Sequence, residues 1–291
     1  MQRYEALLKV LEMGSFTTAG QVLGFSQSAI SKMISSLEEE LEIRLISRSR
    51  YGIRLTPEGS QLLPFIRSAV GQYRSMLLAA EGLRETDTGE IRIGAVASIT
   101  HDWLIPLVGR FWELYPGIHF DIKEEDYSTI ADMVRSGQLD LGFVNEGASA
   151  GLNSVFLKKD EFLLALPKGH PLAGKDRILP EDLQNERFLM VSDEHETYNE
   201  VISVFSDAGV WPDIVLHAHS DSTILSMVEK GYGISILSER IIRSGHCDIV
   251  SRSFHAPVLR SIYIVTREPA LVPIAGKRFL RYVTDHAADL I

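Results

Sequence analysis

Polar side chains on one face of a short helix, between residues 26 and 41, have the chemistry to read nucleic-acid bases. The face consists of Gln27, Ser28, Ser31, Lys32 and Ser35. Glutamine pairs with adenine through two hydrogen bonds, serine donates or accepts one, and lysine reaches guanine or a phosphate. Another face of the same helix carries the apolar residues Ile30, Ile34, Leu37 and Leu41. An ordinary amphipathic helix with a solvated polar face has the same pattern. A second feature is therefore needed to distinguish a DNA-reading helix from an ordinary solvated one.

That second feature is a basic stretch, residues 43–57, which holds arginines and no acidic residue. Arg48, Arg50 and Arg54 lie between Leu45 and Leu55, and Gly52 is placed to form the turn of a tight hairpin. Such a hairpin would hold arginine side chains beside a DNA groove, where they neutralise phosphates. The two features together favour double-stranded DNA as a partner.

Helix signals position these residues. Ser15 and Ser26 suit the caps of two consecutive helices, with Gly24 in the turn between them. A long helix is predicted over residues 57–84, capped by Thr56. Its apolar positions recur with the 3.5-residue period of a coiled coil: Leu62, Ile66, Ala69, Tyr73, Met76, Ala80 and Leu83. We expect this helix to pair with a second copy of the chain; packing against its own domain is the alternative.

From Gly89 onward, strand patterns alternate with helix patterns. A strand is predicted at residues 91–97, a helix at 104–115, a strand at 118–122, a helix near 128–136 and a strand at 139–144. Further strand candidates are residues 162–166, 188–191, 214–218, 234–237 and 262–266. This alternation predicts an α/β fold with largely parallel sheets.

Composition limits the function classes. The net charge is −10, but residues 1–87 hold 10 basic and 10 acidic side chains, so the acidic surplus lies wholly in residues 88–291. No apolar run is long enough to span a membrane, and no secretory signal is evident, so we expect a cytoplasmic protein without a membrane partner. The single Cys247 cannot form an internal disulfide. His217 and His219 lack a third ligand, so neither a metal nor a cofactor is expected.

The N-terminal residues resemble the LysR family of transcriptional regulators. The matching pattern is Ser15-Phe16, Ala19-Gly20, Leu23-Gly24, Ser26-Gln27-Ser28, Ile30-Ser31, Leu37-Glu38, Glu40-Leu41, Arg48 and Leu55-Thr56-Pro57-Glu58-Gly59. The resemblance extends over the long helix and the α/β part. Three positions depart from the family pattern: Gly20 replaces an alanine, Glu42 a glycine and Ile46 a phenylalanine. These are packing or capping positions, so they affect local stability and leave the DNA role intact.

The resemblance implies a domain plan. It comprises a winged helix-turn-helix domain at residues 1–58, with the motif at about 16–35, a linker and dimerisation helix at 59–88, and a two-lobed, periplasmic-binding-protein-like effector domain at 89–291. The first lobe would cover about 89–161 and 268–291, and the second about 162–267. Gln27, Ser28, Ser31 and Lys32 would meet bases, while Arg48 and Arg50 would hold the DNA backbone or minor groove. A homodimer through residues 59–84, a homotetramer and contact with RNA polymerase are also expected.

The resemblance further implies that a small-molecule effector binds between the lobes. Strand ends followed by helix starts would face this cleft, and backbone N–H groups there bind oxyanions. The expected contacts are Ser98, Ile99, Thr100, Asn145, Ser192, His219 and Ser220. Helix capping is the alternative role for the polar members of this set. The nearby residues His101, Asp102, Glu146 and Asp221 would mix the charge of the cleft, which disfavours a simple dicarboxylate.

Two other function classes compete with a ligand-responsive regulator. An α/β enzyme is disfavoured because the sequence has no nucleophile elbow, phosphate loop or metal cluster. A ligand-independent architectural DNA-binding protein would keep the N-terminal pattern but have no need of the hydroxyls of Ser98 and Thr100. The sequence therefore favours a DNA-binding regulator that responds to a small molecule.

Overall fold

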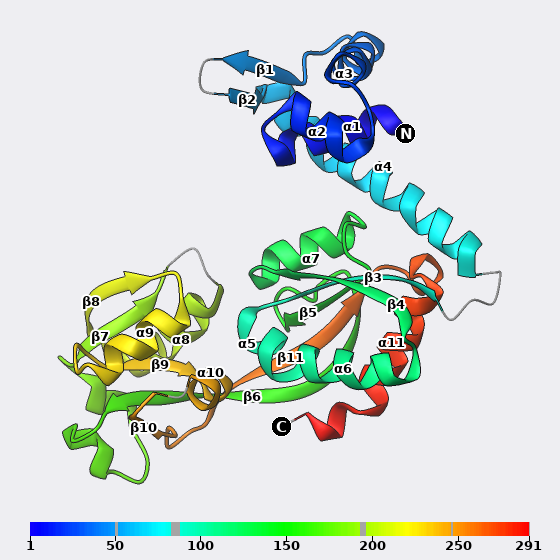
Figure 1. The fold of residues 1–291 in the computed structure, drawn as a ribbon. Helices are drawn as coiled ribbons and strands as arrows, with labels where there is room; N and C mark the ends of the chain where they lie inside the picture. The colour runs from blue at the N-terminus through cyan, green and yellow to red at the C-terminus, as the bar shows by residue number, and fades with distance from the viewer. Residues whose placement is uncertain (50–51, 83–87, 193–195, 246, 291) are drawn as a thin grey trace.

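The computed structural model describes residues 1–49, 52–82, 88–192, 196–245 and 247–290. It shows an N-terminal helical domain, a long helix that leads away from this domain, and a C-terminal part with two lobes (Figure 1). The expected fold class is confirmed: a winged helix-turn-helix is joined by a long helix to a two-lobed α/β domain.

The N-terminal domain packs short helices against a β-hairpin. Its elements are α1 (Gln2–Met13), α2 (Phe16–Leu23), α3 (Gln27–Leu41), β1 (Ile46–Ser49) and β2 (Gly52–Leu55). The side chains of Ser15 and Ser26 accept hydrogen bonds from the backbone N–H groups of Thr18 and Ala29, so both act as the expected caps. Gly24 ends α2 with a φ of 74°, a left-handed conformation that glycine adopts without steric cost. The apolar face of α3 forms the centre of the core between these helices.

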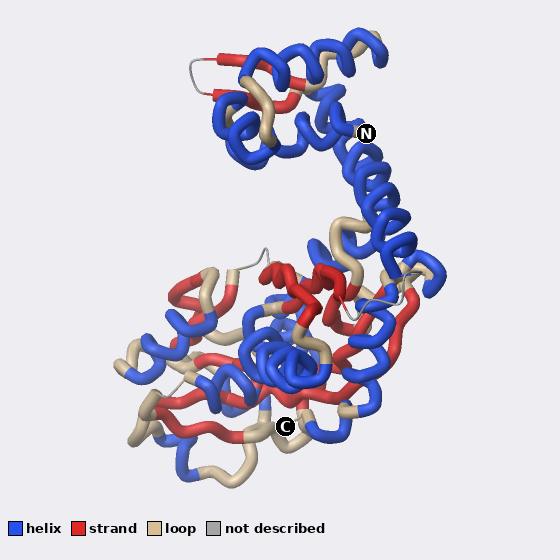
Figure 2. The backbone as a smooth tube through the Cα atoms, turned by 45° about the vertical axis from the view of Figure 1, so that its right-hand side comes forward, coloured by secondary structure: helices blue, strands red, loops and turns tan. Residues whose placement is uncertain are grey.

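Helix α4 (Pro57–Gly82) connects the two parts of the chain. The Thr56 hydroxyl accepts a hydrogen bond from the Gly59 N–H at 2.9 Å and so caps the helix as expected. In its first turns, Leu62 and Ile66 pack into the core of the N-terminal domain. Further along, Gly71 lies directly against the backbone of Ser136 and Gly137 in the first lobe. Figure 2 shows α4 standing clear of the rest of the chain between these two contacts.

The expected dimer seam is therefore wrong in its first part. Leu62 and Ile66 belong to the core of their own domain, which is the alternative that the sequence left open. Among the side chains of α4 that the structure describes, the exposed apolar ones include three members of the expected seam, and we call this set the α4 strip: Phe65, Ala69, Met76, Leu77 and Ala80. Periodicity alone did not show that the first turns of the seam pack on their own domain, because the same apolar period serves both contacts. Leu83 lies outside the described residues.

The first lobe is built on strands β4 (Gly117–Glu124), β3 (Thr88–Ala95) and β5 (Leu141–Asn145), together with parts of β11 and β6. Strand β3 pairs in parallel with both β4 and β5. Its helical elements are α5 (Ala97–Ile99), a π-helical turn (Thr100–Leu104), α6 (Ile105–Leu114), α7 (Tyr127–Arg135), η4 (Pro269–Leu271), α11 (Ile274–Asp285) and η5 (Ala287–Asp289). Phe111, Phe279 and Trp103 are fully buried in its core.

The second lobe holds strands β7 (Arg187–Val191), β8 (Asp213–Ala218), β9 (Ser235–Ser238) and β10 (Ile249–Arg252). Strands β7 and β8 are parallel, while β9 and β10 pair antiparallel with β6. Its helical elements are η2 (Pro171–Gly174), η3 (Pro180–Leu183), α8 (Glu196–Ala208), α9 (Asp221–Glu229) and α10 (Glu239–Ser244). Phe188 and Phe205 meet edge to face in its core, with ring centroids 5.1 Å apart.

Strands β6 (Asn153–Pro167) and β11 (Val258–Thr266) run antiparallel through both lobes and join them (Figure 1). Because β11 also pairs antiparallel with β5, and β6 with β9 and β10, the prediction of largely parallel sheets is wrong: among the described strands of the two lobes, only β3–β4, β3–β5 and β7–β8 are parallel. Ile262 pairs with Asn145 of β5, so β11 has already entered the first lobe at that residue. The expected second boundary, which begins the returning part of the first lobe at residue 268, is therefore late, and residues 262–267 belong to the first lobe. Their alternating pattern predicts a strand correctly, but a strand that spans two lobes carries no local sign of where it crosses.

Candidate functional site

The N-terminal turns of α3 present a polar face to solvent. Gln27, Ser28 and Lys32 are exposed, while Ser31 and Ser35 are half-buried at the edge of the same face. The opposite face, with Ile30, Ile34 and Leu37, is buried, so the rotation of the helix about its axis is fixed by packing. The arrangement suits insertion of the helix start into a major groove.

The hairpin β1–β2 follows α3 as expected, with Ser49 paired to Gly52 and Ile46 to Leu55. Arg54 is exposed on β2. The backbone of Arg48 lies in β1, and Arg50 lies outside the described residues. Arg44 is exposed just before the hairpin, where a shallow hollow lined by Ile34, Ser35, Glu38, Arg44 and Ile46 lies between α3 and β1. Arginines and the polar helix face therefore come from adjacent elements.

Glu38 positions the hairpin relative to α3, a role that the sequence did not predict. Its carboxylate accepts hydrogen bonds from the N–H groups of Leu45 at 2.7 Å and Ile46 at 3.1 Å, and forms an ion pair with Arg44 at 3.0 Å. The residue is 7% exposed. Within the run of three glutamates, only the helical register distinguishes Glu38, because it places this position on the face of Ile34 and Leu41.

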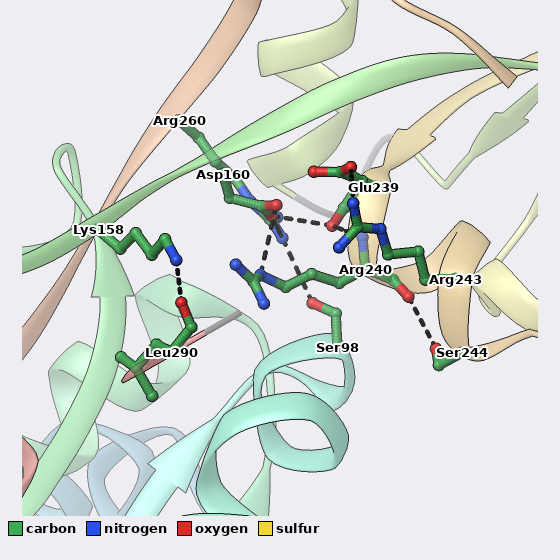
Figure 3. Close-up of polar contacts among 10 residues, drawn as sticks. Ser98, Lys158, Asp160, Glu239, Arg240, Arg243, Ser244, Arg260 and Leu290 are labelled. Carbon is green, nitrogen blue, oxygen red and sulfur yellow. Dashed lines mark hydrogen bonds and ion pairs between the residues drawn. The ribbon is translucent and has the colours of Figure 1, made fainter. Parts of the chain in front are cut away.

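A buried charged cluster lies where β6 and β11 pass between the lobes (Figure 3). The Asp160 carboxylate accepts hydrogen bonds from Arg260 Nε at 2.8 Å and Ser238 Oγ at 2.8 Å. Arg240 forms an ion pair with the second oxygen of Asp160 at 3.4 Å, and its guanidinium carbon lies 4.0 Å from the centre of the Trp103 ring. The Arg260 guanidinium also donates to Ser98 Oγ at 3.4 Å. We call Ser98, Asp160, Ser238, Arg240 and Arg260 the interlobe cluster.

The interlobe cluster keeps its charges despite burial. Burial acts to lower the pKa of Arg260, but the carboxylates of Asp160 and Glu200 and the hydrogen bond to Asp160 outweigh it, so the pKa of Arg260 is raised. Burial lowers the pKa of Arg240, an effect that the charges of Asp160 and Asp102 offset only in part. Because an arginine pKa starts far above neutrality, both side chains remain cations at physiological pH.

Two further side chains border the interlobe cluster. Tyr127 begins α7 in the first lobe, and its ring centre lies 5.9 Å from the guanidinium carbon of Arg260. Glu200 lies in α8 of the second lobe and accepts a hydrogen bond from Asn145 Nδ2 at 2.9 Å. The Asn145–Glu200 hydrogen bond therefore bridges the two lobes. Burial raises the pKa of Tyr127, so its hydroxyl stays protonated.

The expected effector contacts of the first lobe have different surroundings. Ser98 lies in the interlobe cluster, and Asn145 reaches the second lobe through Glu200. The Thr100 hydroxyl donates to the Val96 carbonyl of its own turn at 3.3 Å, which is the local role that the sequence left open. The Ile99 side chain is fully buried in the core of the first lobe, and its N–H donates to Val96. The structure thus gives Ile99 a packing role.

The expected contacts of the second lobe lie at strand ends. Ser192 follows β7, is 6% exposed, and donates its backbone N–H to the Ala218 carbonyl. His219 and Ser220 follow β8 and are exposed, and the Ser220 hydroxyl meets that of Ser222 at 2.7 Å. These hydrogen bonds of Ser192 and Ser220 are to residues of the second lobe, whereas Ser98 belongs to the interlobe cluster.

Sequence reasoning missed most of the interlobe cluster. Asp160, Arg240, Arg260, Tyr127 and Glu200 were not expected at the site. A signal exists for Asp160 and Arg260, since each is a charged residue next to the apolar alternation of a strand. Their pairing across a hundred residues of sequence has no local signature, and the sequence alone does not reveal it.

Across the described ranges, no group of three or more His, Cys, Asp or Glu side chains is arranged to hold a metal ion. Likewise, the helices that the structure describes include none with the length and hydropathy needed to cross a membrane.

Comparison with known proteins agrees with this architecture. Residues 1–60 match the bacterial regulatory helix-turn-helix family of LysR type, and residues 84–288 match the LysR substrate binding domain family. A curated relative, the uncharacterized HTH-type transcriptional regulator YvbU of Bacillus subtilis, is 27% identical over 95% of this chain and 94% of its own length.

Two solved structures resemble the fold over nearly the whole chain. A variant of full-length OxyR from Pseudomonas aeruginosa has a TM-score of 0.72 at 24% identity, covering 98% of this chain and 93% of that one. CbnR complexed with its target DNA also has a TM-score of 0.72, at 19% identity, covering 98% of this chain and 99% of that one. With both family domains present in order and along most of its length, this chain belongs to the LysR family of DNA-binding transcriptional regulators.

Proposed function

We propose that the chain recognises its DNA target through the N-terminal turns of α3 and the arginines around the β1–β2 hairpin, and that an effector bound between the lobes controls this activity. In this proposal Gln27, Ser28, Ser31 and Lys32 contact base edges, with Ser35 beside them. Arg44 and Arg54, together with the expected Arg48 and Arg50, hold phosphates. The target is chromosomal DNA, which places the protein in the cytoplasm and brings it close to RNA polymerase.

The observation that carries the effector proposal is the convergence of Ser98, Asp160, Arg240 and Arg260 between the lobes. Buried charges in a protein are expensive unless they are paired and hydrogen-bonded, and retaining four polar groups at a lobe junction contributes little to stability. Polar groups that converge at such a junction suit a ligand that changes how the lobes sit together.

Relatives named hydrogen peroxide-inducible genes activators suggest a second input, oxidation of a thiol. In this chain Cys247 is the single cysteine, so an intramolecular disulfide cannot form. Cys247 is half-buried and packs against the apolar cluster of α9 and α10. A reversibly bound small molecule therefore remains the proposed signal.

Genome-wide mapping of bound sites, followed by a reporter gene at a mapped site, tests the proposal. The wild-type chain should enrich a small set of promoters, and the genes beside them would supply candidate effectors. Ser98→Ala should keep the same occupied sites but weaken the effector response, since loss of one hydrogen bond costs roughly 0.5–3 kcal/mol of ligand affinity. An unchanged response at every effector concentration would place the ligand elsewhere.

We also propose that the chain dimerises through the α4 strip, and that two such dimers form the tetramer expected for the family. Phe65 is 72% exposed and Met76 is 57% exposed, a large apolar surface for an isolated helix in water. Phe65, Ala69 and Met76 are spaced by four and seven residues, which places them at positions d, a and a of one coiled-coil seam, with Ala80 beside it. A second copy of the same strip is the occupant that this periodicity fits.

A further inference from the structure

Two buried polar atoms beside the interlobe cluster have no hydrogen-bond partner. One is the hydroxyl oxygen of Tyr127, a residue that is 1% exposed, and the other is Oε2 of Glu200. Buried polar atoms in folded proteins are nearly always hydrogen-bonded to protein or to ordered water. Tyr127 and Glu200 therefore each offer a hydrogen-bonding atom that a ligand at the lobe junction could meet.

The two atoms approach the junction from opposite lobes. Tyr127 begins α7 of the first lobe and lies against the Arg260 guanidinium, whereas Glu200 lies in α8 of the second lobe. The hydrogen bond between Asn145 and Glu200 Oε1 holds the Glu200 carboxylate against the first lobe. A ligand between Tyr127 and Glu200 Oε2 would therefore touch both lobes at once.

The charges of the site determine which ligand fits. Asp160 already compensates Arg260 through contacts of 2.6 and 2.8 Å, and it also pairs with Arg240. The charge of Asp102 further offsets that of Arg240. Glu200 accepts a hydrogen bond from the neutral amide of Asn145, and its charge also acts on Arg260, which Asp160 already neutralises. Two arginines, Arg240 and Arg260, therefore face three carboxylates, and a positive charge on a ligand would balance the excess negative charge.

We propose that the effector carries a cationic nitrogen, an ammonium or a guanidinium group, that donates a hydrogen bond to Glu200 Oε2, while the Tyr127 hydroxyl bonds a polar atom beside it. This inference rests on the proposed function of the interlobe cluster as the effector site. A dicarboxylate does not fit, because it would add two negative charges beside Asp160, Asp102 and Glu200.

Thermal unfolding of the full chain with two matched series of small molecules tests the chemical class. The cationic series is putrescine and L-arginine, and the anionic series is succinate and glutarate. A ligand that binds the folded state alone raises the unfolding temperature, so the cationic series should stabilise the wild-type protein and the anionic series should not. Glu200→Gln keeps the side-chain shape and the bond from Asn145 but removes the charge, and should weaken cation binding roughly ten- to hundredfold.

Two variants complete this comparison. Tyr127→Phe removes one hydroxyl and keeps the packed ring, so it should weaken cation binding by a smaller factor than Glu200→Gln. Asp207→Asn removes an exposed carboxylate from the same helix and should leave binding unchanged. Stabilisation by the dicarboxylates alone, or cation binding that survives Glu200→Gln, would overturn the proposed class while leaving an effector site between the lobes.

The ligand-free protein supplies a second readout, which decides the matter if neither series binds. If the third carboxylate leaves the junction with excess negative charge, Glu200→Gln should raise the unfolding temperature, whereas Asp207→Asn should not. An unchanged or lowered unfolding temperature would show that Glu200 serves only to bridge the lobes, and would overturn the inference. Failure of the proposed function has a different signature, namely no enriched promoters or a Ser98→Ala variant with an intact response.

Discussion

The residues of the proposed DNA interface are of two kinds: some would contact bases, and others would contact the DNA backbone. Gln27 is exposed at the first turn of α3, where a side chain reaches base edges, whereas Arg54 projects from the hairpin. Base contacts give specificity, and phosphate contacts give affinity that depends on salt. The two kinds of residue therefore have distinct experimental signatures.

Gln27→Ala should cost about 1–3 kcal/mol at one base position and relax sequence preference there. Arg54→Ala should weaken binding to all sequences by a similar factor and reduce the slope of affinity against salt. Binding to a randomised operator library, repeated at several salt concentrations, separates the two effects. A Gln27→Ala variant with the wild-type specificity profile would show that this side chain lies outside the groove.

Glu42 shows how a departure from the family pattern acts at one residue. It ends α3 with a φ of 55°, a left-handed conformation that is unfavourable for a residue with a side chain. The sequence identified Glu42 as standing in place of a glycine, and the structure supplies the reason why glycine suits the position.

Glu42→Gly should therefore stabilise the chain by about 0.5–1 kcal/mol, because glycine adopts this conformation without strain. Glu39→Gly, at an exposed position inside the same helix, should destabilise it by a similar amount. Chemical denaturation of both variants measures the change in the free energy of unfolding, which should have opposite signs for the two substitutions. Destabilisation by Glu42→Gly would mean that contacts of the glutamate side chain outweigh the backbone strain.

At the scale of elements, periodicity predicted most helices and strands of the first lobe, together with α3 and the hairpin. It did so because their apolar residues face one core with a regular period. The segment from Asn153 to Glu161 was missed, because Lys158, Lys159 and Asp160 interrupt its apolar pattern. Asp160 pairs with Arg260 at the lobe junction, and Lys158 donates to the Leu290 carbonyl within the first lobe (Figure 3). These polar contacts interrupt the apolar pattern of β6, so the pattern did not reveal the strand.

The apolar period of helix α4 serves two contacts, one with the core of the N-terminal domain and one with the proposed second copy of the chain. Phe65→Asp combined with Met76→Asp should place charges in the proposed dimer seam and yield folded monomers that bind operator DNA weakly. Ile66→Asp is the contrasting variant: its side chain is 5% exposed within the core of the N-terminal domain, so it should unfold that domain instead. Light scattering combined with circular dichroism distinguishes the two results. Folded dimers of the Phe65, Met76 double variant would contradict the seam.

At the scale of the whole molecule, an effector can act on DNA binding only if its site and the recognition helix are mechanically connected. Strand β11 contributes Arg260 to the interlobe cluster, and the chain after it contributes Arg267, which covers Gly137. Gly137 and Ser136 in turn lie against Gly71 of α4. A movement of the lobes would thus reach the linker helix through one contiguous set of packed groups. The sequence did not predict this connection, because it depends on close approaches of glycine backbones that leave no periodic trace.

The contact at Gly71 is the part of this connection that a single substitution tests. A Cβ atom at Gly71 would lie 2.6 Å from the carbonyl oxygens of both Ser136 and Gly137, which is backbone that cannot easily yield. Gly71→Ala should therefore separate α4 from the first lobe and destabilise the chain by roughly 1–3 kcal/mol. Operator binding without effector should persist, since the recognition helix is untouched. The change in operator affinity caused by the effector should become smaller, because the effector-free and effector-bound proteins would no longer differ in the position of α4.

Gly109→Ala is the matched control, because a Cβ there meets nothing within 4 Å and glycine is unfavourable inside helix α6. It should stabilise the chain by up to about 1 kcal/mol and leave the effector response intact. The measurements are thermal unfolding and operator affinity with and without effector. If Gly71→Ala kept the full wild-type response while losing stability, the contact between α4 and the first lobe would be structural support only, and the signal would have to pass between the subunits of the dimer instead.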